Sequence, residues 1–95
     1  DVQVVGVKQM QKLKQDKVFG IGDNLRRLRK RKGYTQVDIA AKLDLYGLNI
    51  SRVTYNKMEH NNYSIRINEL LALKLILDCD FEDFFQDIEY PKMRE

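Results

Sequence analysis

The spacing of apolar residues limits the fold of this chain more than any other feature. Between residues 21 and 85, apolar side chains recur with the period of an amphipathic α-helix. Helix breakers are sparse, because the chain has five glycines and one proline, Pro91, near its end. Alternating β-branched residues occur only at Val2–Val7. The pattern predicts an all-α fold of five short helices, at residues 22–32, 36–43, 51–59, 67–77 and 81–86.

Residues with capping chemistry mark the ends of these helices. Gly33 stands where a helix ends in a left-handed conformation. Thr35 is an N-cap for the second helix, and Asp38 completes a capping box with it. Gly47 supplies a positive φ in the next connector. The caps predicted for the later helices are Asn49 or Ser51, and Asp80.

Composition and charge narrow the class of protein. The chain has 95 residues, of which 43% are hydrophobic, so it can form one small domain with a core. Lys74 interrupts the longest apolar run, and the first residues lack a secretory signal, so we expect a cytoplasmic protein with no membrane contact. The single cysteine, Cys79, excludes an internal disulfide and a multi-cysteine zinc site.

The charge is unevenly distributed. Residues 8–36 hold ten basic and two acidic residues, a local charge of +8, whereas residues 78–95 hold two basic and seven acidic residues, a local charge of −5. One end can therefore face a polyanion that the other repels. A merely solvated charged face is the alternative interpretation.

The chain divides into three parts on this evidence. Residues 1–20 form an N-terminal extension that is weakly structured or helical, with only Met10 and Leu13 as periodic apolar positions between Lys8 and Lys17. Residues 21–86 form the helical domain, and residues 87–95 form a polar tail.

Four segments, read in order, carry a family resemblance. They are LRKRKGYTQ at residues 28–36, QVDIAAKL at 36–43, ISRVTYNKME at 50–59, and residues 69–85 with their final CDFEDFF. Together they resemble the lambda-repressor-like helix-turn-helix family, also called the Cro/C1 or XRE type. The resemblance covers residues 21–85 and implies a compact five-helix domain that binds double-stranded DNA. One departure is that Asp44 replaces the glycine of the family's tight turn, and a longer connector follows.

The resemblance implies a role for each part of the helix-turn-helix. The third helix, at about residues 51–59, would lie in the major groove and read bases, and Arg52 would pair with guanine while Val53 touches a thymine methyl. The alternative is that Val53 is a core residue and that Arg52 and Lys57 are merely solvated. The implied base-reading residues are Ser51, Arg52, Val53 and Lys57. The implied phosphate-binding residues are Gln36, Thr35, Asn56, His60, Asn62 and Ser64.

Two further surfaces follow from the resemblance. Arg29 and Glu59 match a structural ion pair between the first helix and the end of the third. Aligned with the family, Leu75 and Ile76 are left as neighbouring exposed apolar residues, which indicates a homodimer contact to which Phe85 or Tyr90 can add. Burial of that helix by the N-terminal extension is the alternative. The residues expected to face inward are Ile67, Leu70, Leu71, Leu73, Leu77, Phe81 and Phe84.

Catalysis finds no support in the sequence. The chain has one histidine and one cysteine, with no motif at either, and Asp80, Glu82 and Asp83 resemble helix-capping acids rather than a metal loop. Gly20 and Gly22 follow no strand, so they do not form a phosphate loop. We therefore expect no enzyme activity, metal or cofactor.

We expect a bacterial or phage transcriptional regulator, most simply a repressor. The alternative is a protein-interaction module or an antitoxin-like component with a protein partner.

Overall fold

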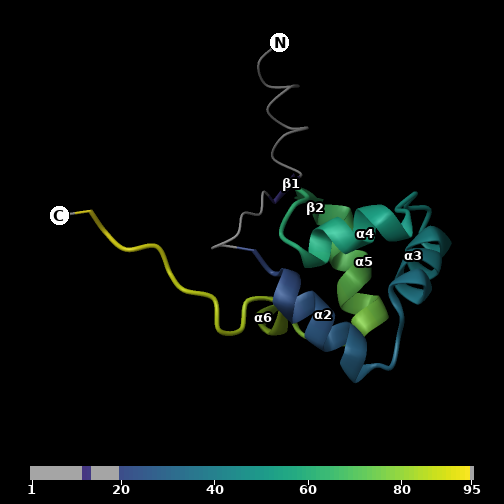
Figure 1. Cartoon of the computed structure of the whole chain (residues 1–95), viewed down its shortest axis with the longest axis horizontal. Coiled ribbons are helices and arrows are strands. Elements are labelled where there is room, and N and C mark those ends of the chain that lie inside the picture. Colours follow the sequence, from purple (N-terminus) through teal and green to yellow (C-terminus); the bar gives the residue numbers. More distant parts are fainter. Residues whose placement is uncertain (1–11, 14–19, 95) are drawn as a thin grey trace, which may run out of the picture.

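The computed structural model describes residues 12–13 and 20–94, which form five helices and one pair of very short strands (Figure 1). The helices pack around a single core, in which α4 contacts both α2 and α3, and α3 contacts α5. The elements in order are β1 (Lys12–Leu13), α2 (Gly22–Arg31), α3 (Gln36–Leu45), α4 (Arg52–Glu59), β2 (Ile65–Arg66), α5 (Ile67–Leu77) and α6 (Phe81–Phe84).

The predicted capping residues act as expected. Gly33 ends α2 with a φ of 76°. The Thr35 hydroxyl accepts a hydrogen bond from the Asp38 amide, and the Asp38 carboxylate accepts one from the Thr35 amide, which completes the capping box of α3. Of the two caps considered for α4, Ser51 is the one used, because its hydroxyl accepts from the Thr54 amide. The helical fold predicted from the periodicity is confirmed.

Two helix ends differ from the prediction by two residues, and the others agree within one residue. Helix α3 continues two residues beyond Leu43, because Asp44 and Leu45 accept helical angles and the chain turns only at Gly47, whose φ is 77°. Helix α6 ends at Phe84 instead of Gln86. The side chain of Asn24, on α2, donates hydrogen bonds to the carbonyl oxygens of Phe84 and Gln86, so those carbonyls are satisfied outside a helix.

Helix α5 corrects the predicted orientation of its apolar residues. Ile76 is only 8% exposed and packs in the core, so it is not part of an exposed pair with Leu75, which is 62% exposed. Ile67 and Leu71, expected in the core, are exposed and lie on the same face as Leu75 at intervals of four residues. The reason is that α5 is apolar on all sides, so its sequence alone does not select the buried face.

The phenylalanines near the end of the domain also divide differently. Phe84 is fully buried, whereas Phe81 and Phe85 are exposed. Phe81 instead lies beside Lys74, whose ammonium is 5.3 Å from its ring centroid. Of these three rings, the one that closes the core is therefore Phe84, on α6, which packs against α2.

The segment before α2, predicted to be weakly structured or helical, contains a two-residue strand among its described residues. Lys12–Leu13 pairs antiparallel with Ile65–Arg66, with Lys12 opposite Arg66 and Leu13 opposite Ile65. The segment between α4 and α5 is extended here, with Ile65 buried and Arg66 exposed, and pairing with β1 provides hydrogen-bond partners for its backbone. The alternating Val2–Val7 stretch and the rest of residues 1–19 lie outside the described residues.

Candidate nucleic-acid interface

Helices α3 and α4 form the helix-turn-helix, and α4 presents a polar face. The buried residues of α4 are Tyr55, Met58 and Glu59, which pack towards α2 and α3. The side of α4 that points away from the core carries the four residues expected to read bases. They are Ser51, Arg52, Val53 and Lys57, all of them exposed.

Val53 separates two interpretations of α4. A core position would require burial, but the side chain is 54% exposed. An exposed valine beside an exposed arginine contributes nothing to the interior, and it is available for contact with an apolar group outside the protein. The core alternative for Val53 is therefore excluded.

The connector between the two helices is longer than a tight turn and has its own anchor. Residues 46–51 join α3 to α4, and the Leu48 amide donates to the Leu43 carbonyl as the helix ends. Leu48 and Ile50 are half-buried against the core. These contacts fix where α4 begins, although Asp44 stands in place of the family's glycine.

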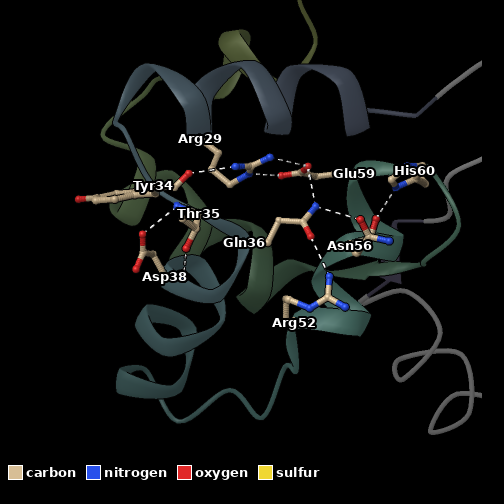
Figure 2. Close-up of polar contacts among 9 residues, drawn as sticks. All are labelled: Arg29, Tyr34, Thr35, Gln36, Asp38, Arg52, Asn56, Glu59 and His60. Carbon is tan, nitrogen blue, oxygen red and sulfur yellow. Dashed lines mark hydrogen bonds and ion pairs between the residues drawn. The ribbon is translucent and has the colours of Figure 1, made fainter.

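The predicted Arg29–Glu59 ion pair is present and buried. The Arg29 Nε lies 2.6 Å from Glu59 Oε2, and Nη2 lies 3.1 Å from Oε1 (Figure 2). The third guanidinium nitrogen, Nη1, donates to the Tyr34 carbonyl oxygen at 2.9 Å. This two-point contact joins the end of α4 to α2 and to the loop before α3.

The charges of this pair are mutually stabilised. Burial opposes ionisation of Glu59, but hydrogen bonds from Arg29 and Gln36 outweigh it and hold the pKa of the carboxyl below its ordinary value. The hydrogen bond to Glu59 raises the pKa of Arg29. The side chain of Tyr55 is buried beside them, and burial raises its pKa as well.

Gln36 lies at the centre of a polar network between α3 and α4 (Figure 2). Its Nε2 donates to Asn56 Oδ1 at 2.9 Å and to Glu59 Oε1 at 3.1 Å. Its Oε1 accepts from Arg52 Nη1 at 3.2 Å. Two residues expected to bind phosphate, Gln36 and Asn56, are thus already bonded to each other, and one expected to read bases is bonded to Gln36.

The residues predicted along the DNA backbone occupy two regions. Thr35 lies exposed at the N-terminus of α3, next to Gln36. His60, Asn62 and Ser64 lie in the segment after α4, where His60 and Asn62 are exposed and Ser64 is half-buried. The Nδ1 of His60 lies 2.8 Å from the Asn56 carbonyl oxygen, which holds the ring close to α4.

Sequence reasoning missed the part played by Asn61 and by Gly20 and Gly22 at the start of α2. Asn61 Oδ1 accepts a hydrogen bond from the Gly22 amide at 2.7 Å and so caps α2 from a distance. A Cβ at Gly22 would lie 2.2 Å from the Glu59 carbonyl oxygen, and one at Gly20 would overlap the Asn61 side chain. The closely spaced glycines were the available signal, and close backbone approach is what they permit.

Two buried polar side chains were also missed. Asn24 joins α2 to the last residue of α6 and to the chain that follows it. Glu69, on α5, accepts hydrogen bonds from the Arg66 amide at 2.8 Å and from the Tyr63 hydroxyl at 2.9 Å. Burial, together with Glu69, raises the pKa of Tyr63 to about 12. These contacts fix the segment that follows α4, so they position the candidate backbone-binding residues indirectly.

The described residues do not support a membrane-spanning helix or a metal site. Among the described residues, no helix is long and apolar enough to cross a membrane. The same residues contain no group of three or more histidine, cysteine, aspartate or glutamate side chains arranged to hold a metal ion. The buried thiol of Cys79 has a pKa raised by that burial.

Comparison with known proteins identifies the family. No curated protein and no solved structure matches the chain. The model of the helix-turn-helix family matches residues 25–84, which is more than half of the chain and includes α3, α4 and the ion pair. The match and the fold agree, and the chain belongs to the Cro/C1-type (XRE) helix-turn-helix family of DNA-binding regulators.

Proposed function

We propose that this protein is a sequence-specific transcriptional repressor of bacterial or phage type, which acts in the cytoplasm by occupying an operator. The observation that carries the proposal is the exposed face of α4, whose other side is fixed by the buried Glu59 and Tyr55. A helix that is fixed on one side and exposed on the other suits the major groove, which admits one α-helix. Bound there, the protein blocks access of polymerase.

In the proposed complex, different residues contact the bases and the phosphates. Arg52 reads guanine, Val53 contacts a thymine methyl, and Ser51 and Lys57 contact neighbouring base edges. The backbone contacts come from the start of α3 and the segment after α4, where helix N-termini and polar side chains meet phosphate. They are made by Gln36, Thr35, Asn56, His60, Asn62 and Ser64.

Selection of bound sites from random double-stranded DNA tests the proposal. A motif should emerge, and Arg52→Ala should remove the preference at one base pair, at a cost of about 1–3 kcal/mol there. Lys30→Ala should weaken binding to all sequences more evenly. An unchanged motif after Arg52→Ala would show that α4 is wrongly placed on the DNA.

The proposed active form is a homodimer, because one recognition helix contacts only a few base pairs. The surface that supports this is the face of α5 formed by Ile67, Leu71 and Leu75, which replaces the pair first predicted. Leu71 and Leu75 also line a shallow groove of about 220 Å³, whose other walls are Tyr46, Leu48, Asn68 and Ala72. Two copies related by a two-fold axis would present half-sites about one DNA turn apart.

The same apolar face favours a second candidate function. It can bind a different protein, as in an antitoxin-like component that uses this fold both for DNA and for a protein partner. The oligomeric state of the purified protein distinguishes the two functions, because a repressor dimer should form from this chain alone. A monomer that binds DNA without sequence preference, and only at low salt, would favour the interaction module.

A further inference from the structure

We propose that Glu59 positions Arg52 for base reading, acting through the side-chain amide of Gln36. Glu59 pairs with Arg29 in the core, but the structure gives its Oε1 a second partner, Gln36 Nε2, at 3.1 Å (Figure 2). The proposal rests on the proposed function, because it concerns how the reading residue is held.

Each of the three side chains is limited in what it can donate or accept. A carboxylate only accepts hydrogen bonds, and a guanidinium only donates them. A glutamine amide does both, at opposite ends, so its direction depends on its neighbours. Gln36 lies between Glu59 on one side and Arg52 on the other.

Glu59 therefore fixes the direction of the Gln36 amide. The amide nitrogen must face Glu59, since the amide oxygen there would meet the carboxylate acceptor with no hydrogen between them. Asn56 accepts the second amide hydrogen at 2.9 Å, but its own side chain could turn to suit either direction. The carboxylate of Glu59, which Arg29 holds in place, therefore allows only one of the two orientations of the Gln36 amide.

The consequence falls on Arg52. With the amide nitrogen turned to Glu59, the oxygen of Gln36 faces the start of α4 and accepts from Arg52 Nη1 at 3.2 Å. Arg52 is exposed, so few other contacts restrict its long side chain. One nitrogen is held in this way, and the remaining donors of the guanidinium stay available for a base. Arg52 has then lost part of its conformational entropy in the free protein, so binding to a base costs less entropy.

The proposal separates two roles for Gln36. A glutamine that only touches phosphate would contribute evenly to all DNA sequences. A glutamine that positions Arg52 would contribute only to the base pair that Arg52 reads, and nothing once Arg52 is absent.

Two variants test the chain of contacts. Gln36→Met keeps the length of the side chain and removes both ends of the amide. Glu59→Gln keeps the shape of residue 59 but lets its own amide nitrogen meet Gln36, which would then turn and face Arg52 with a donor. Gln86→Met is the matched control, because the side chain of Gln86 is exposed and Asn24 contacts its backbone carbonyl, which the substitution leaves in place.

The measurement is the binding preference at each base pair of the site selected by the unaltered chain, with Arg52→Ala marking the base pair that Arg52 reads. Both variants should reduce the preference there by about tenfold, in line with the loss of an oriented contact. Preferences at other positions should stay unchanged. In the Arg52→Ala background, Gln36→Met should cause no further loss at that base pair.

Four outcomes would overturn the inference. Equal weakening at every base pair, or a loss that adds fully to that of Arg52→Ala, would assign Gln36 to the phosphates alone. A motif that both variants leave intact would remove the inference but retain the proposed function. Failure of the unaltered chain to select any motif would remove both.

A measurement on the unaltered chain covers the case in which Glu59→Gln does not fold. In nuclear magnetic resonance spectra, the side-chain amide hydrogens of Gln36 should exchange with solvent more slowly than those of Gln86. The reason is that the Gln36 amide nitrogen donates two hydrogen bonds, to Asn56 and to Glu59. Their shifts should also change as Glu59 is protonated. Exchange as fast as at Gln86 would contradict the link between Glu59 and Gln36.

Discussion

At the scale of single residues, Glu59 combines burial with an unusual number of partners. The residue is 3% exposed, and its carboxylate accepts from Arg29 and from Gln36. A charge so far from water is tolerated only while its partners remain, because an uncompensated buried charge is strongly destabilising. Substitutions here therefore report on the whole contact between α2 and α4.

Glu59→Ala should lower the free energy of unfolding by about 3 kcal/mol, since it leaves the Arg29 guanidinium buried without its counter-charge. Urea unfolding followed by circular dichroism measures the loss. Lys57→Ala is the control: Lys57 is exposed on the same helix, so its stability should stay near that of the parent while DNA binding weakens. Small and equal losses for both variants would contradict a structural role for the pair.

Acid should remove the contribution of the pair. The pKa of Glu59 is lower in the folded protein than its ordinary value of 4.5, so the folded state binds the proton less readily than the unfolded state. The stabilisation is therefore complete above that ordinary value and is lost as pH falls through the folded pKa.

The urea midpoints of the parent and of Glu59→Gln, compared from about pH 7 down to about pH 3, should converge in acid. The exposed carboxyl of Asp38 also has a lowered pKa, caused by its hydrogen bonds to Thr35, but both proteins share it. A difference between the proteins that is independent of pH would show that the Glu59 charge is not involved.

At the scale of elements, the close approach of α2 to the end of α4 depends on Gly22. Glycine within a helix usually weakens it, and alanine usually helps. Here a Cβ would meet the Glu59 carbonyl oxygen at 2.2 Å, and a backbone atom cannot move aside as a side chain can. The two helices can pack at this distance only without a side chain at residue 22.

Gly22→Ala should therefore destabilise the fold by about 1–3 kcal/mol, as overpacking does in cores. Thermal unfolding measures the effect. Gly33→Ala provides the comparison, because no atom lies within 4 Å of the added Cβ and only the left-handed backbone, with φ at 76°, opposes it. A stabilised Gly22→Ala protein would show that α2 and α4 are farther apart than described.

The elements also show what sequence alone can predict. The end of α2 and the start of α3 were predictable, because Gly33, Thr35 and Asp38 act on their own neighbours in the chain. The Arg29–Glu59 pair was predictable from the family resemblance. The direction of the Gln36 amide was not, because it depends on Glu59, which is 23 positions away.

Two further differences have a similar cause. Which face of α5 is buried was not predictable from an all-round apolar helix, so Ile76 and Leu71 were exchanged between core and surface. The strand at Lys12–Leu13 was not predictable either, because its partner, Ile65–Arg66, lies far along the chain. Local signals are reliable here, and long-range side-chain or backbone partners are not visible in a single sequence.

At the scale of the whole molecule, charge and apolar surface lie on different elements. The basic residues gather at the end of α2, where Lys30, Arg31 and Lys32 are exposed. The acidic residues gather at α6 and beyond. The apolar face of α5 carries neither sign in excess, so two copies can meet there without electrostatic repulsion.

The combined change Leu71→Glu and Leu75→Glu should abolish dimers in analytical ultracentrifugation and retain the fold, since both side chains are exposed. Binding to a full palindromic site should then weaken more than binding to a half-site. Met93→Glu makes the same kind of change on an exposed residue of the tail and should have no effect. A parent protein that is monomeric and binds its full site without cooperativity would exclude this dimer.

The hydrogen bonds of Asn24 also have a consequence for the order in which the chain folds. They join positions 60 and 62 residues apart, so they close nearly the whole domain into a loop. The contacts between α3 and α4 close much shorter segments and cost less chain entropy. We therefore expect the helix-turn-helix to assemble early and α6 to dock late. In unfolding, α6 would leave first, and Phe84 would expose the core before α4 loses its shape.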